Sequence, residues 1–415
     1  MKKPTALISL FVILLLYGCV SSTFGITPSP SSTGSTSTAK PTLLPFEPSA
    51  TPVPALSLEK TVIYQCLDVV GSPPSDAKPQ GILAIFEQHP YLLNLETGVK
   101  KPLDDGQGKF SVSLDGKWLA SQYVDESNKI WLRVETLGDT EQKQIPWNDD
   151  WFLLGGWLDN EHVWISHKTE PLVTVINPFS GEQQELAPDF PGLETVAAAG
   201  EHFALGASTV LYNSSLTLAV YPRLENDGYV YLVLWDVQSN RVLAKVMDRA
   251  KSFSYLPLWS LDQKEIYVAM VDKWDNSNPR NFIYDFFSFN QDGQVRQLTD
   301  FGASFADTRI GDVSLSPDGR KIAFWLQLRP SLQEEQQLAV LDLETQQVTD
   351  YCVPGSLHLD APSPIWSLDS RYLAVQNQYE PNAGRVILVD TQQKWAVQLT
   401  EIVPNGWPAG WMAEP

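Results

Sequence analysis

The sequence predicts an all-β protein: a seven-bladed β-propeller of four-stranded antiparallel blades, closed by pairing of its N- and C-terminal strands. Three observations predict this fold. A hairpin motif recurs along the chain, a second hairpin follows each copy, and a strand-like segment at the C-terminal end has no hairpin partner. A repeat of about 40 to 50 residues that holds four strands is typical of a propeller blade.

The first hairpin is clearest in SLSPDGRKIAFW, which starts at Ser314 and combines apolar alternation with a Pro-Asp-Gly turn. Related segments carry a turn aspartate at positions spaced 44, 103, 56 and 51 residues apart: Asp115, Asp159, Asp262, Asp318 and Asp369. The gap of 103 predicts a degenerate copy near its middle, where VLYNSSLTLAVY has Asn213 in the turn. Because a turn aspartate accepts backbone N–H bonds, we predict a structural role for Asp318.

The second hairpin follows all six copies, and its segments begin at Trp131, Val173, Tyr231, Tyr284, Leu338 and Val386. A seventh, starting at Tyr91, is preceded only by the run ILAIF. The C-terminal PAGWMAEP should supply the missing strand, which would remove two exposed sheet edges. Tryptophans recur at the end of the first strand, and we expect them between neighbouring blades, with a channel lining as the alternative: Trp157, Trp259, Trp366 and Trp411.

The segment SPDGRKIAF resembles the repeat of TolB-type, WD-repeat-like bacterial propellers, which also occurs in the propeller domains of prolyl oligopeptidase relatives. The resemblance covers about Gly81 to Pro415. It implies the fold and says little of function, because one fold hosts many roles. The chain has a tether where TolB has an α/β domain, and it lacks the G-x-S-x-G elbow of the peptidases.

The N-terminal segment predicts export. Lys2 and Lys3 precede an apolar run that is short for a membrane span, and the run ends in LYGC at Cys19. This end resembles a bacterial lipobox, with Tyr17 as a departure, and the resemblance implies a signal peptide over 1–18 and a lipid on Cys19. An uncleaved anchor is the alternative. Either way we expect an exported protein held at the outer face of a membrane, at the cell surface or in the periplasm.

Residues 19–58 are rich in Ser, Thr and Pro and predict a disordered tether, so the propeller is expected over 59–415. Two cysteines follow Cys19. In an exported chain Cys66 and Cys352 suggest a disulfide, with two separate buried thiols as the alternative. The net charge of −20 argues against nucleic acid as a partner, because phosphate backbones repel such a surface. We expect a monomer.

The propeller strand order places the short turns on one face of the ring and the long connections on the other; we name these the short-turn face and the long-loop face. Binding residues usually lie on loops that a rigid scaffold holds. Aromatic and arginine side chains suit sugar or protein contacts. The candidate ligand contacts, whose alternative is ordinary solvated loops, are Tyr221, Arg223, Trp274, Arg280, Arg329 and Tyr379.

Motifs for metals and cofactors are absent from the sequence, and we expect neither. The segment VDKWDNSN, which holds Asp272, Asp275 and Asn276, is a weak candidate for calcium because it lacks the glycine and terminal glutamate of a calcium loop. The expected function is a non-catalytic binding or scaffold module for a protein, peptide or glycan ligand. The alternative is a carbohydrate-active hydrolase or lyase, with two carboxylates converging from different blades on the long-loop face.

Overall fold

The structure is a computed structural model. It describes residues 62–74, 77, 79–87, 89–103, 110–137, 141–147, 152–167, 173–186, 190, 210–248, 257–274, 282–328, 336–355, 362–380, 383–404 and 406–414. All of these belong to one compact unit, Thr51–Pro415. The lipobox, Cys19 and the expected tether lie outside the described residues. Within the described ranges no helix has the length and apolar character needed to cross a membrane.

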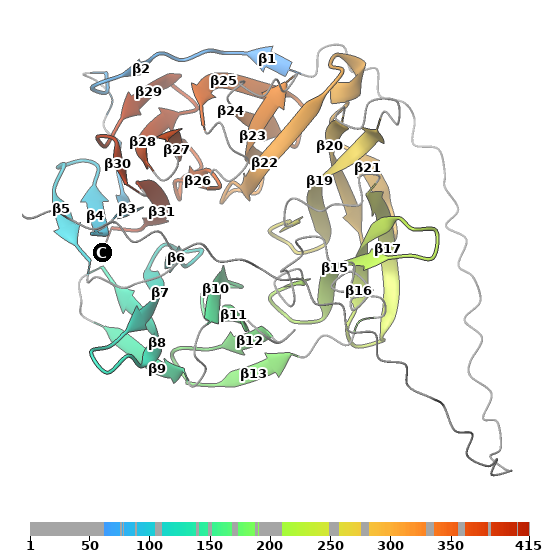
Figure 1. The fold of residues 1–415 in the computed structure, drawn as a ribbon, viewed down its shortest axis with the longest axis horizontal. Coiled ribbons are helices and arrows are strands. Elements are labelled where there is room, and N and C mark those ends of the chain that lie inside the picture. Colours follow the sequence, from blue (N-terminus) through green and yellow to red (C-terminus); the bar gives the residue numbers. More distant parts are fainter. Residues whose placement is uncertain are drawn as a thin grey trace, which may run out of the picture. The chain divides into compact units, whose positions relative to one another are not determined.

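The described strands form seven sheets, each built on four antiparallel strands, which confirms the predicted propeller (Figure 1). Blade 1 contains β31 (Trp407–Met412), β3 (Ile82–Phe86), β4 (Tyr91–Asn94) and β5 (Lys100–Pro102). Blade 2 contains β6 (Phe110–Val112), β7 (Trp118–Val124), β8 (Ile130–Thr136) and β9 (Gln142–Trp147). Blade 3 contains β10 (Phe152–Trp157), β11 (Val163–His167), β12 (Val173–Ile176) and β13 (Gln183–Leu186).

The remaining four blades follow in chain order. Blade 4 contains β14 (Leu211–Tyr212), β15 (Leu218–Leu224), β16 (Val230–Asp236) and β17 (Arg241–Asp248). Blade 5 contains β18 (Leu258–Trp259), β19 (Glu265–Trp274), β20 (Phe282–Asn290) and β21 (Val295–Gln297), followed by the short helix η2 (Phe301–Ala303). Blade 6 contains β22 (Thr308–Leu315), β23 (Lys321–Leu328), β24 (Gln337–Asp342) and β25 (Val348–Pro354). Blade 7 contains β26 (Ile365–Trp366), β27 (Tyr372–Glu380), β28 (Ala383–Asp390) and β29 (Trp395–Gln398), with β30 (Val403–Pro404) beside β28.

Each sheet is buried on both faces, which explains why strands such as β19 read as nearly continuous apolar runs. Successive side chains of a strand point to opposite faces of the sheet. Tyr267, Ala269 and Val271 of β19 accordingly pack against blade 6, whereas Ile266 and Val268 pack against blade 4. Similar clusters join all the remaining pairs of neighbouring blades, including blade 7 and blade 1. The core is therefore a closed ring of interfaces between sheets.

The two ends of the propeller meet in blade 1. Strand β31 pairs antiparallel with β3, from Ile82 opposite Met412 to Phe86 opposite Trp407. The C-terminal segment therefore supplies the fourth strand of blade 1, as expected. The closure adds aromatic contacts, because Phe86 stacks on Trp407 with ring centroids 4.5 Å apart.

The repeated tryptophans lie between blades, as predicted. Trp157 Nε1 donates to Ser111 O at 3.0 Å, and Trp366 Nε1 donates to Ser314 O at 3.2 Å, in each case one blade back along the chain. Trp411 stacks on Tyr372 of blade 7. These three side chains are at most 9 % exposed, so they fill the interfaces between sheets.

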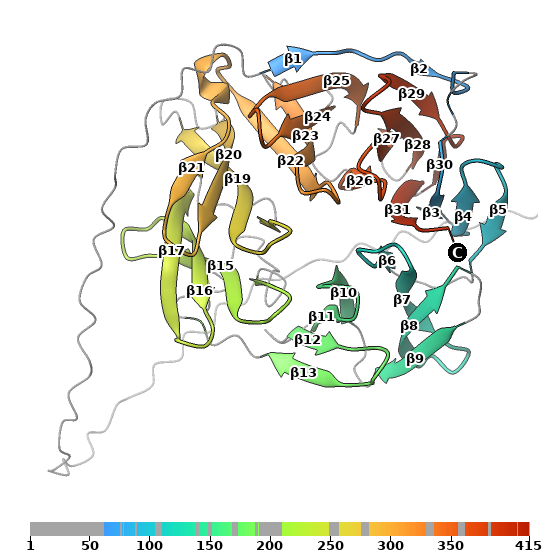
Figure 2. The same ribbon diagram turned by 180° about the vertical axis from the view of Figure 1, so that it is seen from behind.

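Two short strands that the sequence analysis did not foresee run along the outside of blades 6 and 7. We call residues 62–70 the strap. Its first strand, β1 (Val62–Tyr64), pairs parallel with β25, and its second, β2 (Val69–Val70), pairs parallel with β29. Figures 1 and 2 both show the strap beside these outer strands. It covers two sheet edges that would otherwise present unpaired backbone groups.

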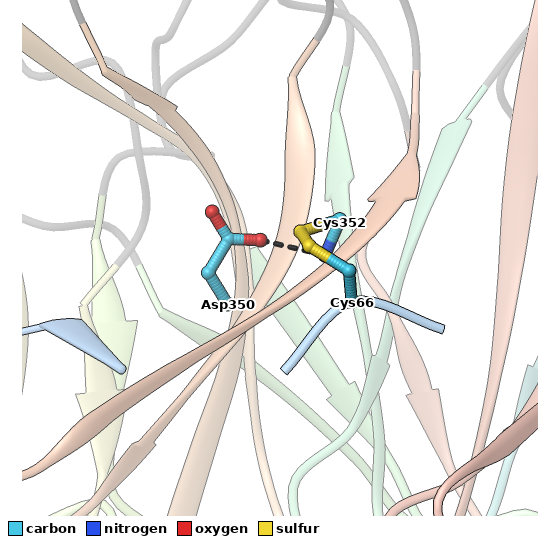
Figure 3. The surroundings of a disulfide bond; sticks show 3 residues. All are labelled: Cys66, Asp350 and Cys352. Carbon is cyan, nitrogen blue, oxygen red and sulfur yellow. Dashed lines mark hydrogen bonds between the residues drawn. A yellow bond between two sulfur atoms is a disulfide. The ribbon is translucent and has the colours of Figure 1, made fainter. Parts of the chain in front are cut away.

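A disulfide fastens the middle of the strap to blade 6. Cys66 lies between β1 and β2, and it is bonded to Cys352 of β25, with the two Cα atoms 4.6 Å apart. The backbone N–H of Cys352 donates to Asp350 Oδ1 at 2.7 Å (Figure 3). The bond closes a loop of 286 residues, and a long loop is the case in which the chain-entropy model expects a cross-link to restrict the unfolded chain most.

Candidate binding faces of the ring

The short-turn face is built from tight turns that their own side chains hold. In blade 6, Ser316 Oγ donates to Asp318 Oδ1 at 2.6 Å, and the N–H groups of Arg320 and Lys321 donate to Asp318 Oδ1 and Ser316 Oγ. The same pattern recurs at three other turns, whose serine and aspartate pairs are Ser113 and Asp115, Ser260 and Asp262, and Ser367 and Asp369. The structural role predicted for Asp318 is therefore confirmed.

The degenerate copy in blade 4 reaches the same geometry with one side chain. Asn213 Oδ1 accepts from the N–H groups of both Thr217 and Leu218 at 2.9 Å. Its Nδ2 donates to Ser215 Oγ at 2.9 Å and to Thr217 Oγ1 at 3.1 Å. The amide thus replaces the serine and the aspartate together, which explains how the turn survives without the Asp-Gly signature.

Hydrogen bonds also link these turns from one blade to the next. The Asp318 N–H donates to Ser370 Oγ of blade 7 at 3.0 Å, and the Ser214 N–H donates to Gln263 Oε1 of blade 5 at 2.9 Å. The Asp115 N–H donates to Asn160 Oδ1 of blade 3 at 2.9 Å. On the short-turn face these hydrogen bonds hold blades 6 and 7, blades 4 and 5, and blades 2 and 3 in register.

The pKa of Asp318 is consistent with a carboxylate that stays ionised and accepts hydrogen bonds within the turn. Partial burial raises the pKa, but the hydrogen bonds from Ser316 and Arg320 and the charges of Lys321 and Arg320 outweigh burial. The pKa therefore lies below its ordinary value. A carboxyl that stays ionised at neutral pH is a hydrogen-bond acceptor and carries no proton to donate.

On the long-loop face, four of the six predicted contacts fall wholly or partly outside the described residues. Arg280 and Arg329 are not described at all. Trp274 ends β19 and Tyr379 lies next to the last residue of β27, so their backbones stand at the long-loop ends of blades 5 and 7. The orientation of these two side chains is not described, and their ligand role stays a prediction.

The expected loop position of the other two residues is wrong, because β15 extends through both. Tyr221 pairs with Val233 inside the blade, and its side chain has no exposed surface. Its ring stacks on Phe190, with centroids 4.7 Å apart. Pro222, which lies between Tyr221 and Arg223, is also part of the strand and pairs with Leu232. Tyr221 therefore belongs to the core.

Arg223 also lies in β15 and has a partner of its own. Its guanidinium forms an ion pair with Glu225, and Lys245 Nζ lies 3.4 Å from the same carboxylate oxygen. Partial burial raises the pKa of Glu225, but Arg223 and Lys245 lower it by more. The arginine is thus neutralised within its own blade, and the turn begins only at Glu225.

One buried carboxyl group that the sequence analysis did not single out lies near the long-loop end of blade 5. Asp285 of β20 has no exposed surface, and its Oδ1 accepts from Thr299 Oγ1 and from the Phe301 N–H, each at 2.8 Å. Its Oδ2 is buried and has no hydrogen-bond partner in the described structure. Burial, together with the charges of Asp272 and Asp300, raises the pKa of Asp285 to about 7.

A raised pKa is common in general acids, but a general acid must touch its substrate. Asp285 is enclosed, and its two hydrogen bonds hold η2 against β20. Its role is therefore to anchor the connection that leads into blade 6.

Within the described residues no group of three acidic, histidine or cysteine side chains is placed to hold a metal ion. Of the weak calcium candidate, Asp272 is described and Asp275 and Asn276 lie outside the described residues. Lys273 Nζ stands between two carboxylates, 3.8 Å from Asp272 Oδ2 and 3.5 Å from Asp300 Oδ1. An ammonium group thus occupies the position where these two charges could share a cation.

Comparison with known proteins places the fold. No protein-family model matches the chain, and a search of curated proteins finds no match either. Among solved structures, an oligogalacturonate lyase in complex with manganese is 10 % identical, with a TM-score of 0.50 over 77 % of this chain and 85 % of that one. TolB from Acinetobacter baumannii is 15 % identical, with a TM-score of 0.45 over 81 % of each chain.

The Cps50 (Swd1) β-propeller domain of Myceliophteria thermophila is 12 % identical, with a TM-score of 0.42 over 72 % of this chain and 94 % of that one. Of these three structures, the lyase reaches a TM-score of 0.50, and at 10 % identity that likeness shows the fold alone, since one fold serves many functions.

Proposed function

We propose that the chain is a membrane-tethered binding propeller, which takes a protein, peptide or glycan ligand on its long-loop face and performs no chemistry on it. The position of the strap carries this proposal. The described chain begins on the rim of the ring, along the outer edges of blades 6 and 7, where the disulfide fastens it. A tether attached at the rim leaves both faces of the ring open to ligands.

The disulfide supports an extracytoplasmic location, because such bonds persist in oxidising compartments. Cys19 would carry the lipid and residues 19–58 would span the distance from the membrane to the rim. A Cys19→Ala variant should be found in the aqueous phase after detergent phase separation, whereas the unchanged chain partitions into detergent. Mass spectrometry of the mature N-terminus gives an independent reading. A variant that still partitions into detergent with a lipoprotein's mass would refute the anchor.

The ligand face is tested separately, with the full-length protein screened against immobilised glycans and solubilised membrane proteins. Trp274→Ala and Tyr379→Ala change the long-loop face, and Glu96→Ala changes an exposed turn on the short-turn face as a control. We expect each of the first two to weaken binding of a captured ligand by more than about 1 kcal/mol if it is an anchor. Loss of binding only in the control would contradict the face assignment, and product release from a captured glycan would favour the enzymatic alternative.

A further inference from the structure

Few noncovalent contacts join the strap to the ring. Its strands β1 and β2 contribute three and two residues to the sheets of blades 6 and 7. Between them, the N–H groups of Gln65 and Leu67 donate to Asp350 O at 2.8 Å and to Tyr351 O at 3.0 Å. Segments held by so few backbone bonds at the edge of a fold open locally at a small cost in free energy. The strap therefore depends on further attachments.

The strap is exposed over much of its length. Val62 packs against the apolar cluster between blades 5 and 6, and Leu67 and Val69 pack against the cluster between blades 6 and 7. All three side chains are only half-buried. Ile63 and Tyr64, by contrast, are 41 % and 57 % exposed. Because apolar contacts stabilise in proportion to the area that they bury, these three add only modestly to the attachment.

The bond between Cys66 and Cys352 (Figure 3) is the covalent attachment, and it lies within reach of solvent. Cys66 is exposed and Cys352 is half-buried. Disulfide exchange requires a thiolate to reach one of the two sulfur atoms, so accessible disulfides exchange more readily than enclosed ones. Of the two cysteines, Cys66 is the one that an external thiol can approach.

The backbone of β25 is irregular at the bonded cysteine. Cys352 has a φ of 55°, in the left-handed region that residues other than glycine rarely adopt. It lies in a bulge, because residues 351–353 of β25 stand opposite the single residue Leu338 of β24. Such strained positions persist only where the surrounding contacts enforce them, and they cluster at switches and functional sites. The bond to the strap is one of these contacts, so breaking it removes a constraint on a strained residue.

We propose that this disulfide is a redox switch: its reduction by an external dithiol releases the strap from the outer edges of blades 6 and 7. One thiolate of the reductant attacks Cys66 Sγ, the bond to Cys352 Sγ breaks, and Cys352 leaves with the electron pair and takes up a proton. The second thiol of the reductant, as its thiolate, then attacks the reductant's own sulfur in the mixed disulfide and frees Cys66 as a thiol. The two cysteines are thereby reduced, and the dithiol is oxidised to a disulfide.

Release changes the ring at its rim. It uncovers backbone groups of β25 and β29 that pair with the strap in the closed form, and such edges can accept an added strand. It also frees the nine residues of the strap, which when extended add up to about 30 Å to the reach of the chain before Gly71. An oxidising compartment keeps the strap closed, so the switch responds to a local supply of reducing thiols. The switch needs neither the lipid anchor nor the ligand face, and its test is independent of theirs.

The test is hydrogen–deuterium exchange, measured by mass spectrometry on the full-length chain before and after reduction with dithiothreitol. Cys19→Ala is present throughout, so that Cys66 and Cys352 are the only cysteines. Peptides that cover the strap report on its release, and peptides of β3 and β31 report on the closure of the ring in blade 1. A second form, Cys66→Ser with Cys352→Ser, lacks the bond without any reductant.

We expect exchange of the strap amides, including those of Gln65 and Leu67, to rise about tenfold or more on reduction, while exchange in β3 and β31 changes less than about twofold. The double variant should match the reduced chain and should not respond to dithiothreitol. A strap that stays protected in both forms would overturn the switch. A comparable rise in blade 1 would also overturn it, because the bond would then be a staple of the whole ring. Reduction that occurs only after urea unfolds the chain would overturn it as well.

Discussion

Two aspartates at opposite ends of the blades accept the same kinds of hydrogen bonds and yet differ in protonation. Each accepts from one side-chain hydroxyl and one backbone N–H. The donors are Ser316 Oγ and Arg320 N for Asp318, and Thr299 Oγ1 and Phe301 N for Asp285. The pKa of Asp318 is lowered, whereas the pKa of Asp285 is raised to about 7.

The difference comes from solvent and from neighbouring charge. Asp318 is partly exposed beside Arg320 and Lys321, so its charged form is solvated and attracted. Asp285 is fully enclosed near Asp272 and Asp300, and one of its oxygens has no described donor. Desolvation and like charge therefore outweigh two short hydrogen bonds. A hydrogen-bond pattern alone does not reveal whether a buried carboxyl is ionised.

The largest expected effect tests this contrast through pH. Asp285 holds its proton in the folded chain up to about pH 7 but loses it near pH 4 when unfolded. Its contribution to stability is therefore full below pH 4 and is lost as pH rises towards 7. As pH rises across this range, the free energy of unfolding of Asp285→Asn should increase relative to that of the unchanged chain. The increase is about 1.4 kcal/mol per pH unit and reaches up to about 4 kcal/mol.

Urea unfolding at intervals from pH 4 to pH 8 measures this gain, and Asp318→Asn is the matched control. Because the folded pKa of Asp318 is lowered, its charge stabilises the fold above the unfolded pKa, and that benefit is lost as pH falls. The Asp318→Asn variant should therefore stay nearly constant relative to the unchanged chain above about pH 4, whereas Asp285→Asn should change between about pH 4 and pH 7. An Asp285→Asn curve as flat as the Asp318→Asn curve would show that both carboxyls are ionised in the fold, which would contradict the contrast.

A smaller effect separates the two ways of building a short turn. Asn213→Ala removes one side chain that makes four hydrogen bonds and is 4 % exposed, so it should cost about 2 to 3 kcal/mol. Asp318→Ala leaves Ser316 to accept from Lys321 and should cost about 1 kcal/mol. Thermal or urea unfolding of the two variants decides the order, and equal costs would mean that the turn depends on backbone bonds alone.

These turns also show how far the sequence could predict the fold. The Asp-Gly turns, the second hairpins and the partnerless C-terminal strand were enough for seven blades and their closure, because each turn is fixed by residues close in sequence. The strap could not be predicted, since its strands carry no turn signal and pair far along the chain, Val62 with Val348 (286 residues later) and Val69 with Ala396 (327 residues later). Tyr221 was expected in a long loop, but β15 runs through it and its side chain is buried, which depends on packing that no local signal shows.

The candidate sites were harder to predict for the same reason. Asp285 lies in a plain apolar strand, and only tertiary packing places Asp272 and Asp300 near it. A cleft on the short-turn face between blades 5 and 6 likewise depends on Leu261 meeting a turn 58 residues further on, at Gly319. Spacing within one repeat carries no information about what two repeats form together.

The smallest effects concern the turn glycines, and they test whether links between blades or the local backbone matter more. Gly181, Gly319 and Gly116 all have a positive φ, between 71° and 78°, so alanine should cost each about 1 kcal/mol of backbone strain. Gly181 has open space around it, so strain is its whole cost. At Gly319 the new methyl group meets Leu261, which can move aside. At Gly116 it meets the backbone nitrogen of Ala413 at 2.7 Å, and that nitrogen donates to Gly116 O.

The free energy of unfolding should therefore decrease in the order Gly181→Ala, Gly319→Ala, Gly116→Ala. The last variant should lose the most, because its methyl group pushes against the strand that closes the ring. Three equal losses would show that backbone strain alone determines the cost of alanine in these turns.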